Sequence, residues 1–143
     1  MNPDPGMQIR AIHSFAASAE RVFDAWLDPE RAGRWLFATP SGEMVRVEID
    51  ARVGGAFVFV DRREGEDVEH VGEYVEIDRA RRLVFTFGVP KYSPVRTRVT
   101  IDIEARGTGC DLTLTHEGVS AAWVARTREG WTGILASLDE LLQ

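Results

Sequence analysis

A series of short alternating segments followed by one long amphipathic stretch constrains the fold of this chain most strongly. The alternation is clearest from Thr97 to Ala105, where Val99, Ile101 and Ile103 are separated by charged or hydroxyl side chains. A period of two is typical of a strand with one buried face. Strands that are joined by short turns and end in one long helix predict a curved sheet that grips this helix.

The predicted strands are short and are separated by turn residues. Glycines mark three of the turns, at Gly54-Gly55, near Gly65 and at Gly107-Thr108-Gly109. The strands are expected at residues 8–15, 45–49, 57–59, 68–77, 83–87, 97–105 and 110–118. This pattern gives an antiparallel sheet of about seven strands in an α+β fold.

Two short helices are predicted directly after the first strand. Ser18 is a suitable N-cap for a helix over residues 19–27. Asp28-Pro29-Glu30 then starts a second helix, because Asp caps free amides, Pro suits the first helical position and Glu favours the positive end of the helix dipole. The second helix is expected to end near Trp35.

The last helix is predicted to begin at Ser120 and to bury one apolar face. That face consists of Trp131, Ile134, Leu135, Leu138, Leu141 and Leu142. Gly130 and Gly133 interrupt the helix, and each glycine costs about 1 kcal/mol relative to alanine. Close packing against the helix, which we favour, or space for a ligand would offset this cost.

Strand alternation also predicts which side chains face the interior. The expected inward set is Phe57, Phe59, Val71, Val75, Leu83, Phe85, Phe87, Thr97, Val99, Ile101, Leu112 and Leu114. Glu73 falls in this set, where a carboxylate would need a partner, unless a bulge near Gly72 turns it outward. His116 follows Leu114 in the same register, but its place at a strand end favours an exposed side chain.

Composition excludes several classes of function. The 143 residues carry a net charge of −6 with a pI of about 5.1 and no long basic run, so a nucleic acid partner is not expected. No apolar stretch approaches the ~20 residues that span a bilayer, and residues 1–6 do not resemble a secretory signal. The sequence therefore predicts a cytoplasmic protein without membrane association.

Metal, cofactor and nucleophilic sites are not predicted either. Cys110 is the single cysteine, and no histidine pair has ligand spacing. Cys110 and His116 would lie about 20 Å apart on an extended strand, too far for a catalytic dyad. No phosphate-binding glycine loop is present, so we expect neither a metal nor a cofactor. The connection over residues 88–94 is longer than a hairpin needs and suits either a flap at a cavity mouth or an ordinary exposed loop.

The order of these segments resembles the START-like (SRPBCC) superfamily, in particular the family of proteins like the activator of the 90-kDa heat-shock protein's ATPase. The resemblance covers residues 9–142 and rests on several quoted pieces. These are Ser18-Ala19-Glu20-Arg21-Val22-Phe23, Asp28-Pro29-Glu30 with Trp35, Gly54-Gly55-Ala56-Phe57, the block over residues 72–87, Leu112-Thr113-Leu114-Thr115-His116 and Gly130-Trp131. It implies one helix-grip domain over residues 8–143 after an extension of residues 1–7.

The resemblance also implies an apolar cavity between the sheet and the last helix. The predicted ligand-binding residues are Trp35, Phe57, Phe59, Glu73, Phe85, Phe87, Tyr92, Val99, Leu114, His116, Gly130 and Trp131. Trp35-Leu36 stands where the family often has two adjacent tryptophans, a departure that bears on the cavity entrance.

Three functions follow from this resemblance. The leading hypothesis is a binding protein for a small, largely apolar molecule, and no oligomeric state is predicted. A cyclase- or hydrolase-like enzyme would use Glu73 or His116 as acid–base groups. A co-chaperone-like interaction module would bind a chaperone, but the eukaryotic co-chaperone uses an additional N-terminal domain, and only a few residues precede the first strand here.

Overall fold

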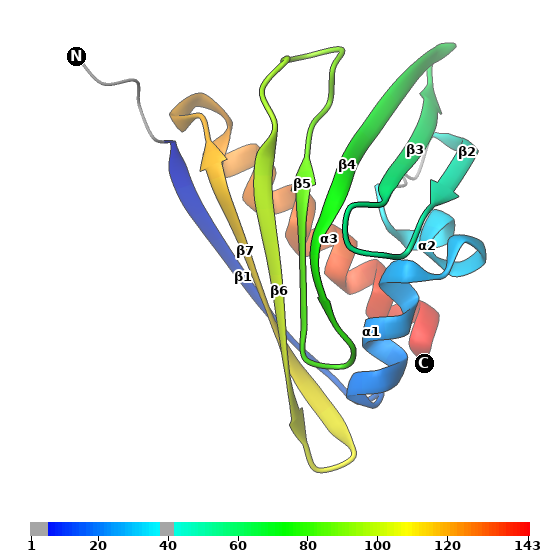
Figure 1. Cartoon of the computed structure of the whole chain (residues 1–143), viewed down its shortest axis with the longest axis vertical. Coiled ribbons are helices and arrows are strands. Elements are labelled where there is room, and N and C mark those ends of the chain that lie inside the picture. Colours follow the sequence, from blue (N-terminus) through cyan, green and yellow to red (C-terminus); the bar gives the residue numbers. More distant parts are fainter. Residues whose placement is uncertain (1–5, 38–41) are drawn as a thin grey trace.

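The computed structural model describes residues 6–37 and 42–143. Its elements follow the predicted order of a strand, two short helices, further strands and a long final helix (Figure 1). The bounds are β1 Met7–Phe15, α1 Ala19–Leu27, α2 Pro29–Trp35, β2 Glu43–Ile49, β3 Ala56–Arg63, β4 Glu66–Asp78, β5 Arg82–Phe87, β6 Thr97–Arg106, β7 Gly109–Val119, a 3₁₀ turn Ala121–Trp123 and α3 Val124–Leu142.

The strands form one antiparallel sheet in the order β1-β7-β6-β5-β4-β3-β2. Each strand from β2 to β7 pairs with the next in sequence, and β1 pairs with β7. In Figure 1, α3 runs diagonally behind the sheet, and α1 and α2 lie beside the C-terminal half of α3. This is the predicted helix-grip fold.

Local sequence signals explain the bounds of the two short helices. The Ser18 hydroxyl accepts a hydrogen bond from the Arg21 amide at 3.3 Å and so caps α1. Asp28 Oδ1 accepts from the Glu30 amide at 3.0 Å, and Pro29 occupies the first position of α2. Both helices therefore begin where the sequence predicted.

The last helix starts differently from the prediction. A 3₁₀ turn over Ala121–Trp123 precedes α3, and the Ser120 side chain makes no capping hydrogen bond. The α-helix itself begins at Val124. Its predicted apolar face is confirmed, since Trp131, Leu135 and Leu138 are at most 3% exposed.

The core fills the space between α3, the two short helices and the sheet. Val99, Ile101, Leu112 and Leu114 on the central strands are fully buried, as predicted. Each such side chain stabilises the fold by about 1.5–3 kcal/mol relative to an exposed position. The interior is therefore densely packed beneath β6 and β7, which limits where a ligand could enter.

The predicted inward face of β4 was wrong. The buried residues of this strand are Val68, His70, Gly72 and Tyr74, whereas Glu73 and Val75 are exposed. Gly72 explains the error, because a Cβ here would lie 1.8 Å from the Thr86 carbonyl oxygen and 2.6 Å from the Phe57 ring. Because this inward position is occupied by glycine, it does not contribute an apolar side chain to the alternation. The remaining apolar residues, Val71 and Val75, therefore indicated the opposite face of β4.

A bulge also corrects the predicted face of β2. The register of β2 against β3 shifts between Met44 and Arg46. As a result Met44 packs against the core, whereas Val45, the first residue of the predicted strand over 45–49, is 38% exposed and does not share the partly buried face of Val47 and Ile49.

Candidate functional site

Two adjoining hollows lie between the sheet and the N-terminal half of α3. We call the first the loop hollow; it has a volume of about 410 Å³ and is lined by Gly6, Phe87, Gly88, Val89, Tyr92, Ser93, Val95, Thr97, His116, Gly118, Val119, Ser120, Trp123 and Thr127. We call the second the helix hollow; it has a volume of about 270 Å³ and is lined by Phe37, Arg63, His70, Phe87, Val89, Thr127, Gly130, Trp131 and Ile134. Clefts of this size with mostly apolar walls are typical of small-molecule sites.

Three residues join the two hollows. Phe87 at the end of β5, Val89 in the following loop and Thr127 on α3 line both of them. The loop is fixed at its base, because Val71 and Gly88 exchange two backbone hydrogen bonds of 2.9 Å. An elongated ligand could therefore extend from one hollow into the other past Val89 and Thr127.

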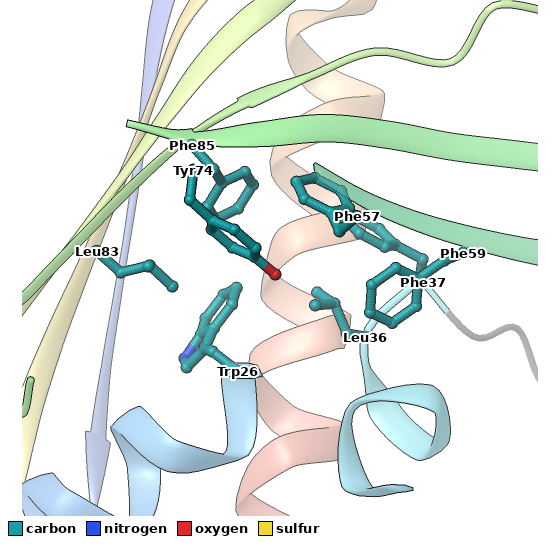
Figure 2. Close-up of a pocket in the computed structure, with 8 residues that line it drawn as sticks. All are labelled: Trp26, Leu36, Phe37, Phe57, Phe59, Tyr74, Leu83 and Phe85. Atoms are coloured by element: carbon teal, nitrogen blue, oxygen red, sulfur yellow. The ribbon is translucent and has the colours of Figure 1, made fainter. Parts of the chain in front are cut away.

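The interior between the aromatic side chains of α1, β3, β4 and β5 is nearly filled. Figure 2 shows Trp26, Leu36, Phe57 and Phe85 around a small space, into which the Tyr74 hydroxyl points. The volume of this space is about 10 Å³, which is at the lower limit for a single water molecule. Burial raises the pKa of Tyr74, so the phenol is neutral. A ligand does not fit here without movement of the core.

Phe37 separates this small space from the helix hollow, since it lines both. Its ring stacks on His70 at 4.8 Å and on Phe87 at 5.0 Å. Phe37 has φ of 61°, a backbone conformation that costs a bulky residue about 1–3 kcal/mol. The aromatic contacts offset this strain and hold the ring as the wall of the hollow.

His116 connects α3 to three strands through a hydrogen-bonded chain. The Trp131 indole N–H donates to His116 Nδ1 at 2.9 Å, and His116 Nε2 lies 2.6 Å from Thr97 Oγ1. Thr97 Oγ1 in turn donates to the Phe87 carbonyl at 3.1 Å. This order requires a neutral imidazole with its proton on Nε2, because Nδ1 must accept.

Burial agrees with this assignment. His116 is 3% exposed, and desolvation lowers its pKa to about 4. The prediction of an exposed His116 was therefore wrong, because Trp131 of α3 packs against the ring and bonds to it near the end of β7. Both ring nitrogens are engaged, so His116 is not placed as a free acid–base group.

Glu73, the other predicted acid–base residue, points away from the interior. Its side chain is 59% exposed, and its carboxylate lies 3.8 Å from the Arg96 guanidinium. Glu73 does not line either hollow because it lies on the exposed face of β4 and not on the inward face that was predicted. The structure thus places neither Glu73 nor His116 as a free acid–base group in the hollows.

The two helix glycines also differ from expectation. A Cβ at Gly130 or at Gly133 would meet nothing within 4 Å, so neither glycine is required for close packing. Gly130 lines the helix hollow, whereas Gly133 is exposed and lines neither hollow. Only Gly130 therefore leaves space at the candidate site.

The other predicted site residues fall into three groups. Phe87, Tyr92, His116, Gly130 and Trp131 line the hollows. Phe57, Phe59 and Phe85 line only the small interior space. Trp35, Val99 and Leu114 are core residues, at most 1% exposed, and line none of these cavities.

Sequence reasoning missed several lining residues, among them Phe37, Arg63, His70 and Thr127. Phe37 lies in a connection without periodicity, and Arg63 lies beyond the predicted strand over residues 57–59, next to the predicted turn near Gly65. His70 was hidden by the error in the face of β4, because it shares the inward side with Gly72. Thr127 is a polar residue outside the predicted apolar face of the last helix, so no pattern marked it.

Two searches for other kinds of site gave no candidates. Among the residues that the structure describes, no group of three or more histidine, cysteine or carboxylate side chains could hold a metal ion. Within the same residues, no helix is long and apolar enough to cross a bilayer.

Comparison with known proteins identifies the relatives of this fold. The family model described as Activator of Hsp90 ATPase homolog 1-like protein matches residues 16–143. A search of the curated proteins found no match. Among solved structures, protein CV1439 from Chromobacterium violaceum is 29% identical, with a TM-score of 0.87, and the match covers 94% of this chain and 96% of that one.

Two more distant structures share the fold. Protein NE0264 from Nitrosomonas europaea has a TM-score of 0.81 at 20% identity, over 99% of this chain and 97% of that one. The Activator of Hsp90 ATPase homolog 1-like protein from Aeromonas hydrophila has a TM-score of 0.78 at 22% identity, over 94% and 90% of the two chains.

Proposed function

The chain belongs to the family of Activator of Hsp90 ATPase homolog 1-like proteins within the START-like (SRPBCC) superfamily, and we propose that it binds a small, largely apolar molecule in the loop hollow and the helix hollow. Folds of this superfamily generally bind hydrophobic ligands. The observation that carries the proposal is the pair of adjoining hollows, of about 410 and 270 Å³, with aromatic walls.

The walls suit a flat or extended apolar molecule. The hydrogen bond to His116 fixes the indole of Trp131, and the Phe87 ring packs against this indole with the ring centroids 6.2 Å apart. At the mouth, Tyr92 and Trp123 lie with their ring centroids 6.5 Å apart and are 58% and 43% exposed. Aromatic side chains offer large apolar area at low conformational cost, which favours binding.

Two glycine substitutions on one helix test the site. We expect Gly130→Leu to weaken binding of the neutral apolar dye N-phenyl-1-naphthylamine by about tenfold or more, because the new side chain would occupy the helix hollow. Gly133→Leu should leave the affinity unchanged, since Gly133 is exposed and lines neither hollow. A fluorescence titration of each variant measures the difference.

The pair also controls for effects on folding. Both positions have open space around the Cβ, so both substitutions should keep or raise the melting temperature by removing a helix glycine. Equal affinities of the two folded variants, or no dye binding by the unsubstituted protein, would contradict the proposed site.

We propose further that residues 8–143 form one START-like domain after an extension of residues 1–7 and that the protein is cytoplasmic. A chaperone partner is the alternative for an interaction module. Since Glu73 is exposed and both ring nitrogens of His116 are bonded, ligand binding is favoured over an enzyme that uses either residue.

A further inference from the structure

The helix hollow contains two ionisable side chains within its aromatic walls. Arg63 is on β3 and His70 is on β4, and both line the hollow. They lie on the inner face of the sheet together with Asp61, since Asp61 pairs with Val68 and Phe59 pairs with His70 in the strand register. The hollow is therefore polar at the β3–β4 side and, apart from Thr127 on α3, apolar elsewhere.

Among the described residues, Arg63 uses only one of its guanidinium nitrogens as a side-chain hydrogen-bond donor. Its Nε donates to Asp61 Oδ2 at 2.6 Å, and the Asp61 side chain is 1% exposed. Neither terminal nitrogen of the Arg63 guanidinium has a hydrogen-bond partner among residues 6–37 and 42–143. The Arg63 side chain is 33% exposed, so these N–H groups are only partly solvated.

His70 is a second unsatisfied group at the same place. It is 6% exposed, its ring stacks on Phe37 and Phe87, and its Nδ1 has no partner within the part of the chain that the structure describes. Burial lowers the pKa of His70 to about 4, with a further contribution from the charge of Arg63. The Nδ1 atom of the neutral ring can donate or accept one hydrogen bond, depending on the tautomer.

The charges at this end of the hollow balance. The buried carboxylate of Asp61 compensates the charge of Arg63, and His70 is neutral at physiological pH. An anionic ligand group would lie near the Asp61 carboxylate and would be repelled. An uncharged oxygen acceptor would accept hydrogen bonds from the terminal N–H groups of Arg63 without this repulsion.

We propose that the helix hollow recognises the carbonyl end of an otherwise apolar ligand, with Arg63 as the hydrogen-bond donor and His70 as a second polar contact. This inference rests on the proposed function and names its ligand class. The rest of the ligand lies against Phe37, Phe87 and Trp131 and extends past Val89 toward the loop hollow. Arg63 thus determines specificity, and the aromatic walls provide most of the affinity.

Three probes of matched shape test the proposal. They are 2-acetylnaphthalene, with a neutral carbonyl, 2-ethylnaphthalene, without an acceptor, and 2-naphthoate, with a carboxylate. We expect 2-acetylnaphthalene to bind about tenfold more tightly than 2-ethylnaphthalene, because only the ketone accepts a hydrogen bond from the charged Arg63. It should also bind more tightly than 2-naphthoate, because the carboxylate is repelled by Asp61. Titrations followed by amide and indole NMR signals give the affinities and place the probe beside Gly130 and Trp131.

Substitutions at the donor complete the test. Arg63→Met alone would remove the ion pair of the buried Asp61, so the double variant Asp61→Asn/Arg63→Met is used to keep the charge balanced. We expect this variant to lose the preference for the ketone while it still binds 2-ethylnaphthalene. The control is Arg62→Met, which removes an exposed arginine that pairs with Asp67 outside the hollow.

The outcomes separate the two proposals. If none of the three probes binds the unsubstituted protein, the proposed function fails. If the ketone and the hydrocarbon bind equally, or if the double variant keeps the preference, the carbonyl site is overturned and apolar binding stands. Tightest binding of 2-naphthoate would overturn the neutral head group.

Discussion

Replacement of Trp131 by alanine should lower the free energy of unfolding by about 3–5 kcal/mol, as expected for a large aromatic residue removed from a core. Trp131 is 3% exposed, and its ring contacts Trp26, Phe37 and Phe87. The substitution also removes the donor to His116 Nδ1, which leaves a buried acceptor without its partner. Equilibrium unfolding in urea measures the loss.

Two further variants separate volume from hydrogen bonding. Trp131→Phe keeps much of the ring but not the N–H, so it should cost about 1–3 kcal/mol for the unpaired His116 nitrogen. Ser137→Ala lies on the exposed side of the same helix and serves as the control. An unchanged midpoint for Trp131→Ala would show that the helix does not pack against the sheet as described.

Acidification between pH 6.5 and 4 should strongly destabilise the protein. His70 and His116 both have pKa values lowered from 6.5 to about 4 by burial. Above pH 6.5 both rings are neutral in either state, so this stability is fully present. As the pH falls, the unfolded chain binds protons first, and unfolding becomes easier by roughly 3 kcal/mol for each histidine at pH 4.

His70→Phe isolates one histidine from the titrating carboxylates. Phenylalanine can occupy the stacked position beside Phe37 and Phe87, and it binds no proton. Between pH 7 and pH 4, we expect the variant to lose roughly 3 kcal/mol less of its free energy of unfolding than the unsubstituted protein loses. Urea unfolding at several pH values gives this difference, with Ser137→Ala as the parallel control; two parallel curves for His70→Phe would refute the buried neutral ring.

Most of the fold could be predicted because its signals are local. Ser18 and Asp28 mark the starts of α1 and α2, since a capping side chain bonds to amides two or three residues away. The period of two along β6 and the apolar face of α3 likewise depend only on neighbouring residues. Element order and short turns then restrict the topology to a sheet around one helix.

The candidate site depended on contacts between distant segments. The face of β4 was decided by the approach of Phe57 and the Thr86 carbonyl to Gly72, which no property of the strand itself reveals. That single inversion buries His70 and exposes Glu73, so a residue that was not predicted lines the site and a predicted one does not. His116 likewise became a buried neutral group only through Trp131 and Thr97.

The sequence by itself determined the order of the strands and helices, the starts of α1 and α2 and which face of α3 is buried, because backbone hydrogen bonding and side-chain periodicity act over a few residues. Tertiary packing alone decided where space remains. Phe37, Arg63, His70, Val89 and Thr127 meet at the helix hollow from five separate segments. A hollow is the volume that packed elements leave unfilled, so its position and polarity depend on their joint arrangement and on no single stretch of sequence.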